Sequence, residues 1–202
     1  MNYRIGELLP PHIRIRLASA SPRRRELLSA MGLSFTVCPC DVDETVGEGT
    51  HPADAVLLLS ARKAQAAAAC FGAEDVILAS DTLVEIDGVP LGKPKDEADA
   101  LAMLLCLSGR EHRVHTGVSV MRHGECRTAR DTTRVFMRPF TEAEARDYIA
   151  TGEPADKAGA YAIQGLGGAL VDRIEGAYDT VVGLPCAVVD RLLSAFLGLS
   201  DR

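Results

Sequence analysis

Residues 13–28 read IRIRLASASPRRRELL and predict a short strand, a serine-rich turn and then a helix. Ser21 is a suitable N-cap, because its hydroxyl can accept a hydrogen bond from a free N–H of the first turn. Pro22 suits the first helical position, where its missing N–H costs nothing. This strand, turn and helix are the unit around which the rest of the chain is organised.

The charge of that helix start is unusual. Arg23, Arg24 and Arg25 stand in the first turn, where the helix dipole favours acids by roughly 0.3–1 kcal/mol per charge. An anion would explain three cations there, because free N–H groups and guanidinium groups together bind phosphate. The other interpretation is a solvated basic turn in which arginines pair with Glu26 or its neighbours. On this stretch alone both interpretations stay open.

The composition limits the class of protein. The chain has 202 residues, 47% of them hydrophobic, and a net charge of −6, which suits one sizeable α/β domain. A negative chain is a poor general binder of nucleic acid or membrane surfaces, so a basic site must be local. We find no secretory signal and no apolar run that could cross a bilayer. The six scattered cysteines are expected to be reduced in the cytoplasm, and Cys38 and Cys40 alone are a weak zinc or redox signal.

The rest of the chain predicts alternating strands and helices. Residues 1–12 are expected to form a loose leader, and 13–202 a single domain, because no linker divides them. Strands are expected at 34–37, 76–86, 89–91, 113–121, 125–138, 169–174 and 181–182, and helices at 22–31, 52–71, 96–107, 141–150 and 185–197. Asp87-Gly88 is a hairpin signal, and Thr141 with Glu144 forms a capping box.

Residues 151–168 break this pattern. The segment is rich in glycine and carries Glu153, Asp156, Lys157, Tyr161 and Gln164. A long irregular stretch in a compact domain is more often functional than not.

Asp81 is the most informative acid. It follows the apolar run of residues 76–79, and a buried carboxylate is costly unless it is paired, metal-bound or catalytic. The alternative is that Asp81 only caps a turn at the end of the strand. An ordinary aspartic acid has a pKa of about 3.9, so a catalytic base needs either a metal-activated water or a shifted pKa.

Several other charged residues are candidates for a phosphate or metal site. Lys93 stands between Gly92 and Pro94, which fix its backbone, whereas Lys63, Lys95 and Lys157 could equally be surface residues. Asp43 and Glu44 lie in an acidic loop that is either solvated or helps to hold a metal. His112 and His115 are three apart on a predicted strand and so face opposite ways, which argues against a two-histidine metal site.

Familiar nucleotide and hydrolase signatures are missing from the sequence. Residues 165–168 do not complete G-x-G-x-x-G, and neither a G-x-x-x-x-G-K-[ST] loop nor a G-x-S-x-G elbow occurs. A triphosphate would therefore need a different binding device, and a serine hydrolase is disfavoured.

Separated motifs, in order along the chain, resemble those of the Maf family of nucleotide pyrophosphatases. They are Ser19-Ala20-Ser21-Pro22-Arg23-Arg24, Ser80-Asp81-Thr82, Gly92-Lys93-Pro94, Ser108-Gly109-Arg110, His115-Thr116-Gly117-Val118, the run DKAGAYAIQG at 156–165 and Val182-Gly183-Leu184-Pro185. The matches span residues 13–197, and several motifs in order are far more specific than any one of them.

The resemblance implies an α/β, Maf-like (ITPase-like) fold, with a twisted mixed sheet flanked by helices and an active-site cleft between two lobes. It implies hydrolysis of a nucleoside triphosphate between the α and β phosphates, with a divalent cation, Mg²⁺ or Mn²⁺, as cofactor. It also implies a small-molecule nucleotide as partner, neither nucleic acid nor membrane, and a homodimer as a common state. Among the residues, it implies Asp81 as proton acceptor, Asp81 and Asp43 as metal ligands, Arg23, Thr82 and Gln164 as markers of substrate choice, and Ser19, Arg24, Lys63, Lys93 and Lys157 as substrate contacts.

Thr82 and Gln164 favour the dTTP/UTP branch of this family over the 7-methyl-GTP branch, which carries D-Q and a glutamate at these places. A glutamine amide is both donor and acceptor, which suits the imide edge of uracil or thymine. Two competing hypotheses remain: a pyrophosphatase of 7-methyl-GTP or other modified nucleotides, and a non-enzymatic nucleotide-binding regulator of cell division.

Overall fold

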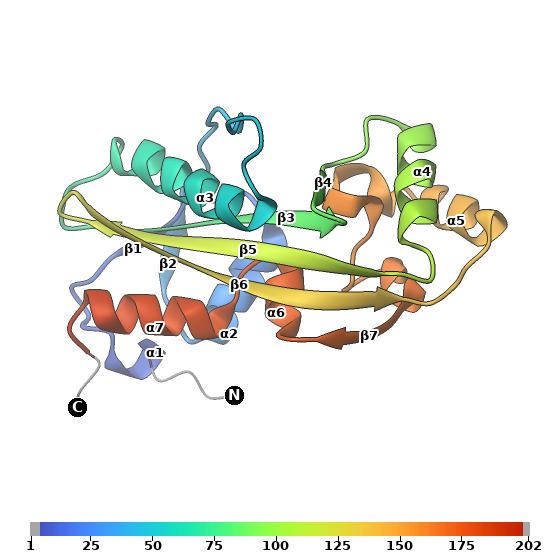
Figure 1. Ribbon diagram of the computed structural model, residues 1–202. Helices are drawn as coiled ribbons and strands as arrows, with labels where there is room; N and C mark the ends of the chain where they lie inside the picture. Colours follow the sequence, from blue (N-terminus) through green and yellow to red (C-terminus); the bar gives the residue numbers. More distant parts are fainter. Residues whose placement is uncertain (1–4, 200–202) are drawn as a thin grey trace.

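The computed structural model describes residues 5–199, which form a seven-stranded mixed sheet flanked by helices (Figure 1). The strand order is β2-β1-β3-β5-β6-β7, and β4 pairs with the end of β3. The first three strands in this order run parallel, and the remaining pairs are antiparallel. Their bounds are β1 (Ile15–Leu17), β2 (Phe35–Val37), β3 (Val76–Ile86), β4 (Val89–Leu91), β5 (Glu111–Arg122), β6 (Glu125–Met137) and β7 (Val171–Glu175).

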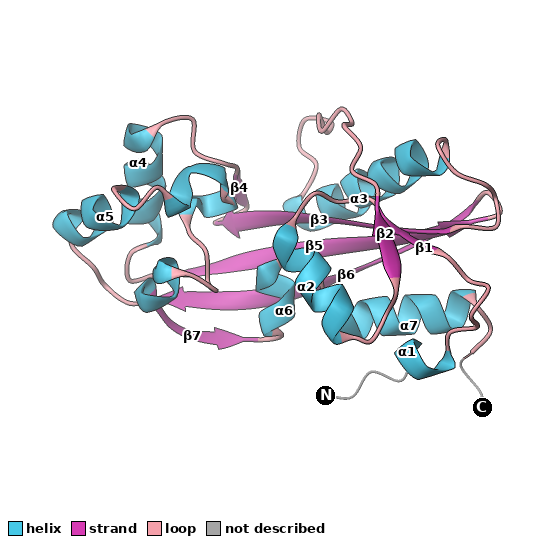
Figure 2. Ribbon diagram, turned by 180° about the vertical axis from the view of Figure 1, so that it is seen from behind, coloured by secondary structure: helices cyan, strands magenta, loops and turns pink. Residues whose placement is uncertain are grey.

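Helices cover both faces of this sheet. α3 (Pro52–Ala68) packs across β3 and β5 on one face, and α2 (Pro22–Ala30), α6 (Tyr178–Val182) and α7 (Cys186–Phe196) lie on the other, with α1 (Ile5–Leu8) beside α7 (Figures 1 and 2). α4 (Glu97–Leu107), α5 (Glu142–Ile149) and the 3₁₀ turns η1 (Glu153–Asp156), η2 (Ala158–Ala160) and η3 (Leu166–Leu170) gather at the far end of the long strands. The predicted mixed α/β fold is confirmed.

The long strands run through two large hydrophobic cores, which define two lobes, and a smaller core lies beneath α3. In β3, Val76 and Leu78 belong to the core beneath α2 and α7, whereas Val84 and Ile86 belong to the core beside α4 and α5. Between them stands the polar stretch 80–82, in which Ser80 and Asp81 are buried and Thr82 is half-buried. The two lobes therefore divide near Asp81.

A glycine brings α3 close to the sheet at this boundary. Gly117 on β5 pairs with Asp81 on β3, and a Cβ at Gly117 would lie 2.3 Å from the carbonyl oxygen of Val56. Any side chain there would push α3 away from the strands. The bare backbone of Gly117 thus lets the helix place its residues over Asp81.

Two sequence predictions are wrong in detail. Residues 5–8 form a helix rather than a loose leader, because Ile5 is fully buried and its N–H donates to Asp190 Oδ1 at 3.2 Å; residues 1–4 lie outside the described part of the chain. The predicted strand at 181–182 belongs to helix α6, where the N–H groups of Gly183 and Leu184 donate back to the Asp179 carbonyl and the local helical turn overrides the strand preference of two valines. Within residues 5–199, no helix is long and apolar enough to cross a membrane.

Candidate active site

The turn between β1 and α2 forms as its sequence predicts. Ser21 caps the helix by accepting a hydrogen bond from the Arg24 N–H at 3.4 Å. The side chain of Arg24 then folds back against the sheet, where Nε donates to the Gly183 carbonyl at 2.8 Å and Nη1 donates to Ser19 Oγ at 3.3 Å. Nη2 donates to Thr82 Oγ1 at 3.1 Å. All three nitrogens of the guanidinium are held, so its orientation is fixed.

Arg24 is a cation with no direct counter-ion. Its hydrogen bonds go to neutral oxygens, and the structure of residues 5–199 gives it no ion pair within 4.0 Å. Burial lowers the pKa of Arg24, and the nearby charge of Asp81 opposes this shift only in part. A guanidinium stays charged in proteins, so an anion that joined Arg24 would relieve the electrostatic cost of burying it.

Thr82 serves as a support for Arg24. Its hydroxyl lies 3.0 Å from Thr116 Oγ1, which itself donates to the Thr180 carbonyl at 2.7 Å. Because the single proton of Thr116 is used there, Thr82 donates to Thr116 and its oxygen is left to accept from Arg24. The chain of hydrogen bonds runs from α6 through both strands to the guanidinium.

Gly183 closes the other side of Arg24. Its carbonyl accepts from both Arg24 Nε and Ser80 Oγ, at 2.8 and 2.9 Å. Its φ of +115° favours glycine, and a Cβ there would come within 3.2 Å of Thr82 Oγ1. The motif Val182-Gly183-Leu184-Pro185 is therefore a backbone support for the arginine.

On the opposite face of β3, Asp81 meets a lysine of α3. Asp81 is 6% exposed, and its Oδ1 accepts from Lys63 Nζ at 2.5 Å. Glu44 Oε1 lies 2.7 Å from the same ammonium. Burial opposes the charge of Lys63, but the two carboxylates outweigh it and raise the pKa of Lys63. The hydrogen bond from Lys63 lowers the pKa of Glu44, so the cluster holds one cation between two anions.

The acidic loop brings Glu44, rather than Asp43, to this cluster. Asp43 turns away to accept a hydrogen bond from Thr45 N at 2.8 Å, and it does not line the pocket. Arg62 on α3 holds the loop by donating to the carbonyls of Asp43 and Thr45 at 3.1 and 2.5 Å. Neighbouring Arg62 and Lys63 thus fix which of the two adjacent acids faces the site.

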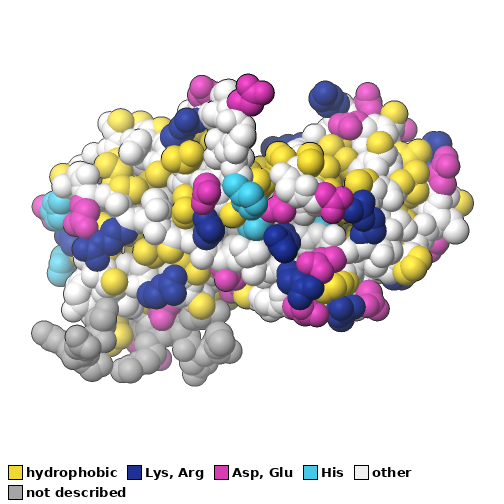
Figure 3. Space-filling view, in the orientation of Figure 1, with side chains coloured by type: hydrophobic (Ala, Val, Ile, Leu, Met, Phe, Trp, Pro, Cys, Tyr) yellow, Lys and Arg dark blue, Asp and Glu magenta, His cyan; other side chains and the backbone are white. Residues whose placement is uncertain are grey.

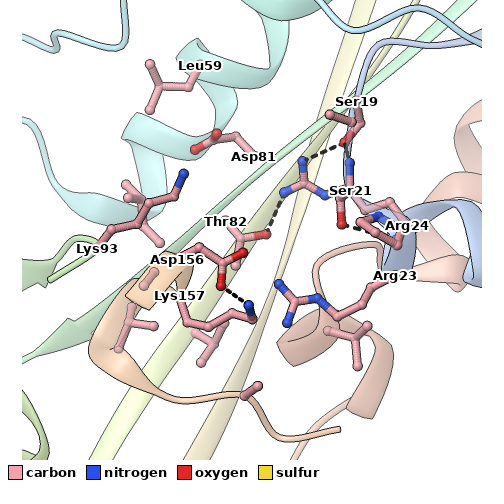
Figure 4. A pocket seen from close by; sticks show the side chains of 18 of the residues that line it. Ser19, Ser21, Arg23, Arg24, Leu59, Asp81, Thr82, Lys93, Asp156 and Lys157 are labelled. Carbon is pink, nitrogen blue, oxygen red and sulfur yellow. Dashed lines mark hydrogen bonds and ion pairs between the residues drawn. The ribbon is translucent and has the colours of Figure 1, made fainter. Parts of the chain in front are cut away.

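These groups line a pocket of about 730 Å³, within the size range of small-molecule sites. Figure 3 shows a notch between the projecting acidic loop and the lobe that carries α4 and α5. In Figure 4, Lys93 points from one wall of the pocket toward the same space as Asp81. Arg23 and Lys157 come from two other walls and point toward each other. Lys157 pairs with Asp156.

The structure brings together nearly all the predicted site residues. The pocket is lined by Ser19, Arg23, Arg24, Lys63, Asp81, Thr82, Lys93, Lys157 and Gln164, whereas Asp43 and Lys95 lie outside it. Arg25 is exposed, as expected for the arginine outside the family motif. His112 and His115 contact different partners, Tyr161 and Glu85, as their opposite strand faces predict.

Some lining residues were missed from the sequence. Cys40 lies in the pocket wall and donates its thiol to the Lys63 carbonyl at 3.3 Å; burial raises its pKa. In the sequence, Cys40 stood out only as half of the weak Cys38 and Cys40 zinc or redox signal, which does not indicate a place in a pocket wall. Thr116 lies behind Thr82 and does not line the pocket. It was quoted only as part of a motif, although its place opposite Thr82 across two paired strands could have indicated its role.

The carboxylates fit a magnesium-like cation bound together with a phosphate. No cluster of three or more His, Cys, Asp or Glu residues suited to a metal occurs between residues 5 and 199. Asp81 and Glu44 nevertheless converge on one point, now met by the Lys63 ammonium. Mg²⁺ is usually bound by one or two carboxylates, with phosphate oxygens and water completing its shell. Two acids suit such a partial site, but not a cage built from protein alone.

The fold and this pocket define an α/β protein with a cation-rich cleft between two lobes. The chain belongs to the Maf family: the family model described as "Maf-like protein" matches residues 14–196. A relative from Vibrio cholerae named "dTTP/UTP pyrophosphatase" is 51% identical over 180 residues, covering 89% of this chain and 96% of that protein. A relative from Methylobacillus flagellatus with the same name is 48% identical over 181 residues, covering 89% and 91%.

A solved structure of a HAM1 protein from Coxiella burnetii aligns with 91% of this chain and 99% of its own. The sequence identity is 16% and the TM-score 0.49.

Proposed function

We propose that the protein is a nucleoside triphosphate pyrophosphatase that hydrolyses dTTP and UTP to the monophosphate and pyrophosphate. One observation carries the proposal: the oriented and uncompensated cation of Arg24 lies across β3 from the buried carboxylate of Asp81, inside one pocket. The names of relatives up to 51% identical support the same activity and substrates.

Neutralising the triphosphate is the first task of the pocket. Charge grows on the phosphate oxygens as water attacks the α-phosphorus and pyrophosphate leaves, so fixed positive charges speed the reaction. Arg24 is held rigidly by its three hydrogen-bonding neighbours, and Arg23, Lys93 and Lys157 reach the pocket from other walls. We assign these four side chains, together with Ser19, to the phosphates.

Asp81 is the proposed proton acceptor for the attacking water. Lys63 holds the carboxylate in place by donating to Asp81 Oδ1 at 2.5 Å. A divalent cation, Mg²⁺ or Mn²⁺, held by Asp81 and Glu44, would supply charge neutralisation and make the water more acidic. Lys63 then balances the charge of the two carboxylates when no cation is present.

Gln164 is the proposed reader of the base. It is exposed in the pocket wall, and its amide offers the donor and acceptor that the imide edge of uracil and thymine requires. Thr82 affects substrate choice indirectly, because its hydroxyl is already bonded to Arg24 and Thr116. A homodimer and a cytoplasmic location stay predictions.

The test is release of pyrophosphate from a panel of triphosphates, with and without Mg²⁺ or Mn²⁺. The panel contains dTTP, UTP, CTP, GTP and 7-methyl-GTP. We expect dTTP and UTP to rank first, only with metal, and Asp81→Asn to lose at least about a hundredfold in turnover while still binding UTP. Release from no triphosphate would favour a binding regulator, and a lead for 7-methyl-GTP would favour the other branch.

A further inference from the structure

The loop that carries Gln164 is held on both sides by two side chains outside the pocket lining. Before Gln164, the Ala162 N–H donates to Tyr148 Oη at 3.1 Å. After it, the N–H groups of Leu166 and Gly167 donate to the Glu153 carboxylate at 2.9 and 3.1 Å. Backbone groups two residues before Gln164 and two and three residues after it are thus fixed from the lobe of α4 and α5.

The two supporting side chains are joined to each other. Tyr148, near the end of α5, donates its hydroxyl to Glu153 Oε1 at 2.7 Å, and Glu153 opens η1. The phenol therefore donates to the carboxylate and accepts from Ala162, while the carboxylate accepts three hydrogen bonds. We call this pair the Tyr148–Glu153 clamp.

The clamp explains two glycines beside Gln164. A Cβ at Gly165 would lie 2.2 Å from Glu153 Oε2, and a Cβ at Gly167 would lie 2.4 Å from Tyr148 Oη. Neither glycine has a positive φ, so the constraint there is close approach: a side chain at Gly165 would displace the Glu153 carboxylate, and one at Gly167 would meet Tyr148 and the Ala162 carbonyl, 2.9 Å away. The loop and the clamp are built as one unit.

The clamp requires a charged carboxylate. Burial would raise the pKa of Glu153, but the hydroxyl of Tyr148 and the N–H groups of Gly167 and Leu166 outweigh it and lower that pKa. Burial and the bond to Glu153 raise the pKa of Tyr148, so the phenol stays protonated and donates. A glutamine at 153 would turn its NH₂ group toward one of these donors, leaving two donors face to face.

We propose that Tyr148 and Glu153 are specificity-determining positioning residues, which act by holding Gln164 in register with the pyrimidine imide edge. This inference rests on the proposed function. Reading an imide edge needs a donor and an acceptor at fixed places, and a loop already ordered before binding loses less entropy when the base arrives. Neither side chain lines the pocket, so the clamp acts through Gln164 alone.

The test compares Glu153→Gln and Tyr148→Phe with the wild type for UTP and CTP, which differ at the edge that Gln164 reads. We expect KM for UTP to rise about tenfold in Glu153→Gln, the scale of leaving a buried donor unpaired. Turnover should change less than about threefold, because the phosphates are bound elsewhere. The preference for UTP over CTP should fall by the same factor as KM rises. Glu142→Gln is the matched control, since Glu142 lies on α5 and pairs only with Arg146 on the surface.

A double-mutant cycle separates positioning from a general structural role. If the clamp acts through Gln164, adding Glu153→Gln to Gln164→Ala should cost no further selectivity. Tyr148→Phe keeps the ring and decides the matter if Glu153→Gln melts below the assay temperature. Unchanged selectivity in Tyr148→Phe, or additive losses in the double variant, would overturn the clamp while the pyrophosphatase stands. A wild type that does not prefer UTP over CTP would overturn both.

Discussion

The ammonium of Lys63 lies 2.5 Å from Asp81 Oδ1. Lys63 comes from the middle of α3 and Asp81 from the boundary between the two cores of β3, so the ion pair ties the helix to the point where the lobes divide. Asp81 is 6% exposed, and a buried carboxylate without a partner is costly. The pair therefore belongs to the site, not to the general surface charge.

Replacing Lys63 with glutamine should lower turnover about a hundredfold, the scale of removing one fixed charge from a transition-state site. The amide keeps a donor near Asp81 but leaves its charge uncompensated. Steady-state kinetics with UTP provide the measurement. Lys95→Gln is the control, because Lys95 is exposed and outside the pocket. Equal turnover in both variants would show that Lys63 does not contribute to the reaction.

The acids of the 43–45 loop should differ in their effect on metal dependence. Glu44→Gln is expected to raise the Mg²⁺ concentration for half-maximal activity on the order of tenfold, because it removes one of two converging carboxylates. Asp43→Asn should leave that Mg²⁺ concentration unchanged, since the Asp43 carboxylate lies outside the pocket and accepts a hydrogen bond from the Thr45 N–H. A Mg²⁺ titration of both variants checks this. A larger rise in the half-maximal Mg²⁺ concentration in Asp43→Asn than in Glu44→Gln would make Asp43, and not Glu44, the metal ligand.

Features fixed by local hydrogen bonds were predictable from the sequence. Ser21 caps α2, Thr141 and Glu144 form the capping box of α5, and β3 turns into β4 at Asp87-Gly88. In each case the residues that form the feature are within four positions of each other. The seven separated motifs together indicated one common site. Two of them contain glycines, Gly117 and Gly183, at which a side chain would meet closely packed neighbours.

Features decided by distant partners were not predictable. Asp43 and Glu44 are adjacent acids. Glu44 is the one that faces the pocket because Arg62 binds the loop carbonyls and Lys63 pairs with Glu44. Residues 178–182 form a helix whose Thr180 carbonyl accepts from Thr116 on a distant strand. Glu153 was noted within an irregular segment, but its partners lie 5 to 14 positions away. Sequence spacing alone does not encode such contacts.

The two neighbouring arginines of α2 should behave oppositely. Arg24→Ala is expected to lower kcat/KM for UTP by about a hundredfold, because it removes a half-buried, oriented cation. Arg25→Ala should stay within about twofold, because Arg25 is exposed. Both variants keep Ser21 as the cap of helix α2, so the start of the helix is matched. The comparison fails if the two alanine variants lose activity to the same extent.

Acid should destabilise the protein through His112. This side chain is 1% exposed, its Nε2 lies 2.8 Å from the Tyr161 hydroxyl, and its Nδ1 meets no hydrogen-bond partner within the described residues. Burial lowers the pKa of His112 from 6.5 to about 4, and the charge of Glu111 opposes this only weakly. Between these two values the unfolded chain binds a proton that the folded chain does not.

The sign follows from linkage: stability is complete above pH 6.5 and falls as the pH drops toward 4. At pH 5 the loss from this one group is about 2 kcal/mol. Urea denaturation at pH 7.5 and 5.0 measures it. In His112→Phe the drop between the two pH values should shrink by about that amount, even though the variant starts less stable because Tyr161 has lost its partner. His12→Gln should keep the full drop, because His12 is exposed. An equal drop in His112→Phe and the wild type would show that His112 does not titrate on unfolding.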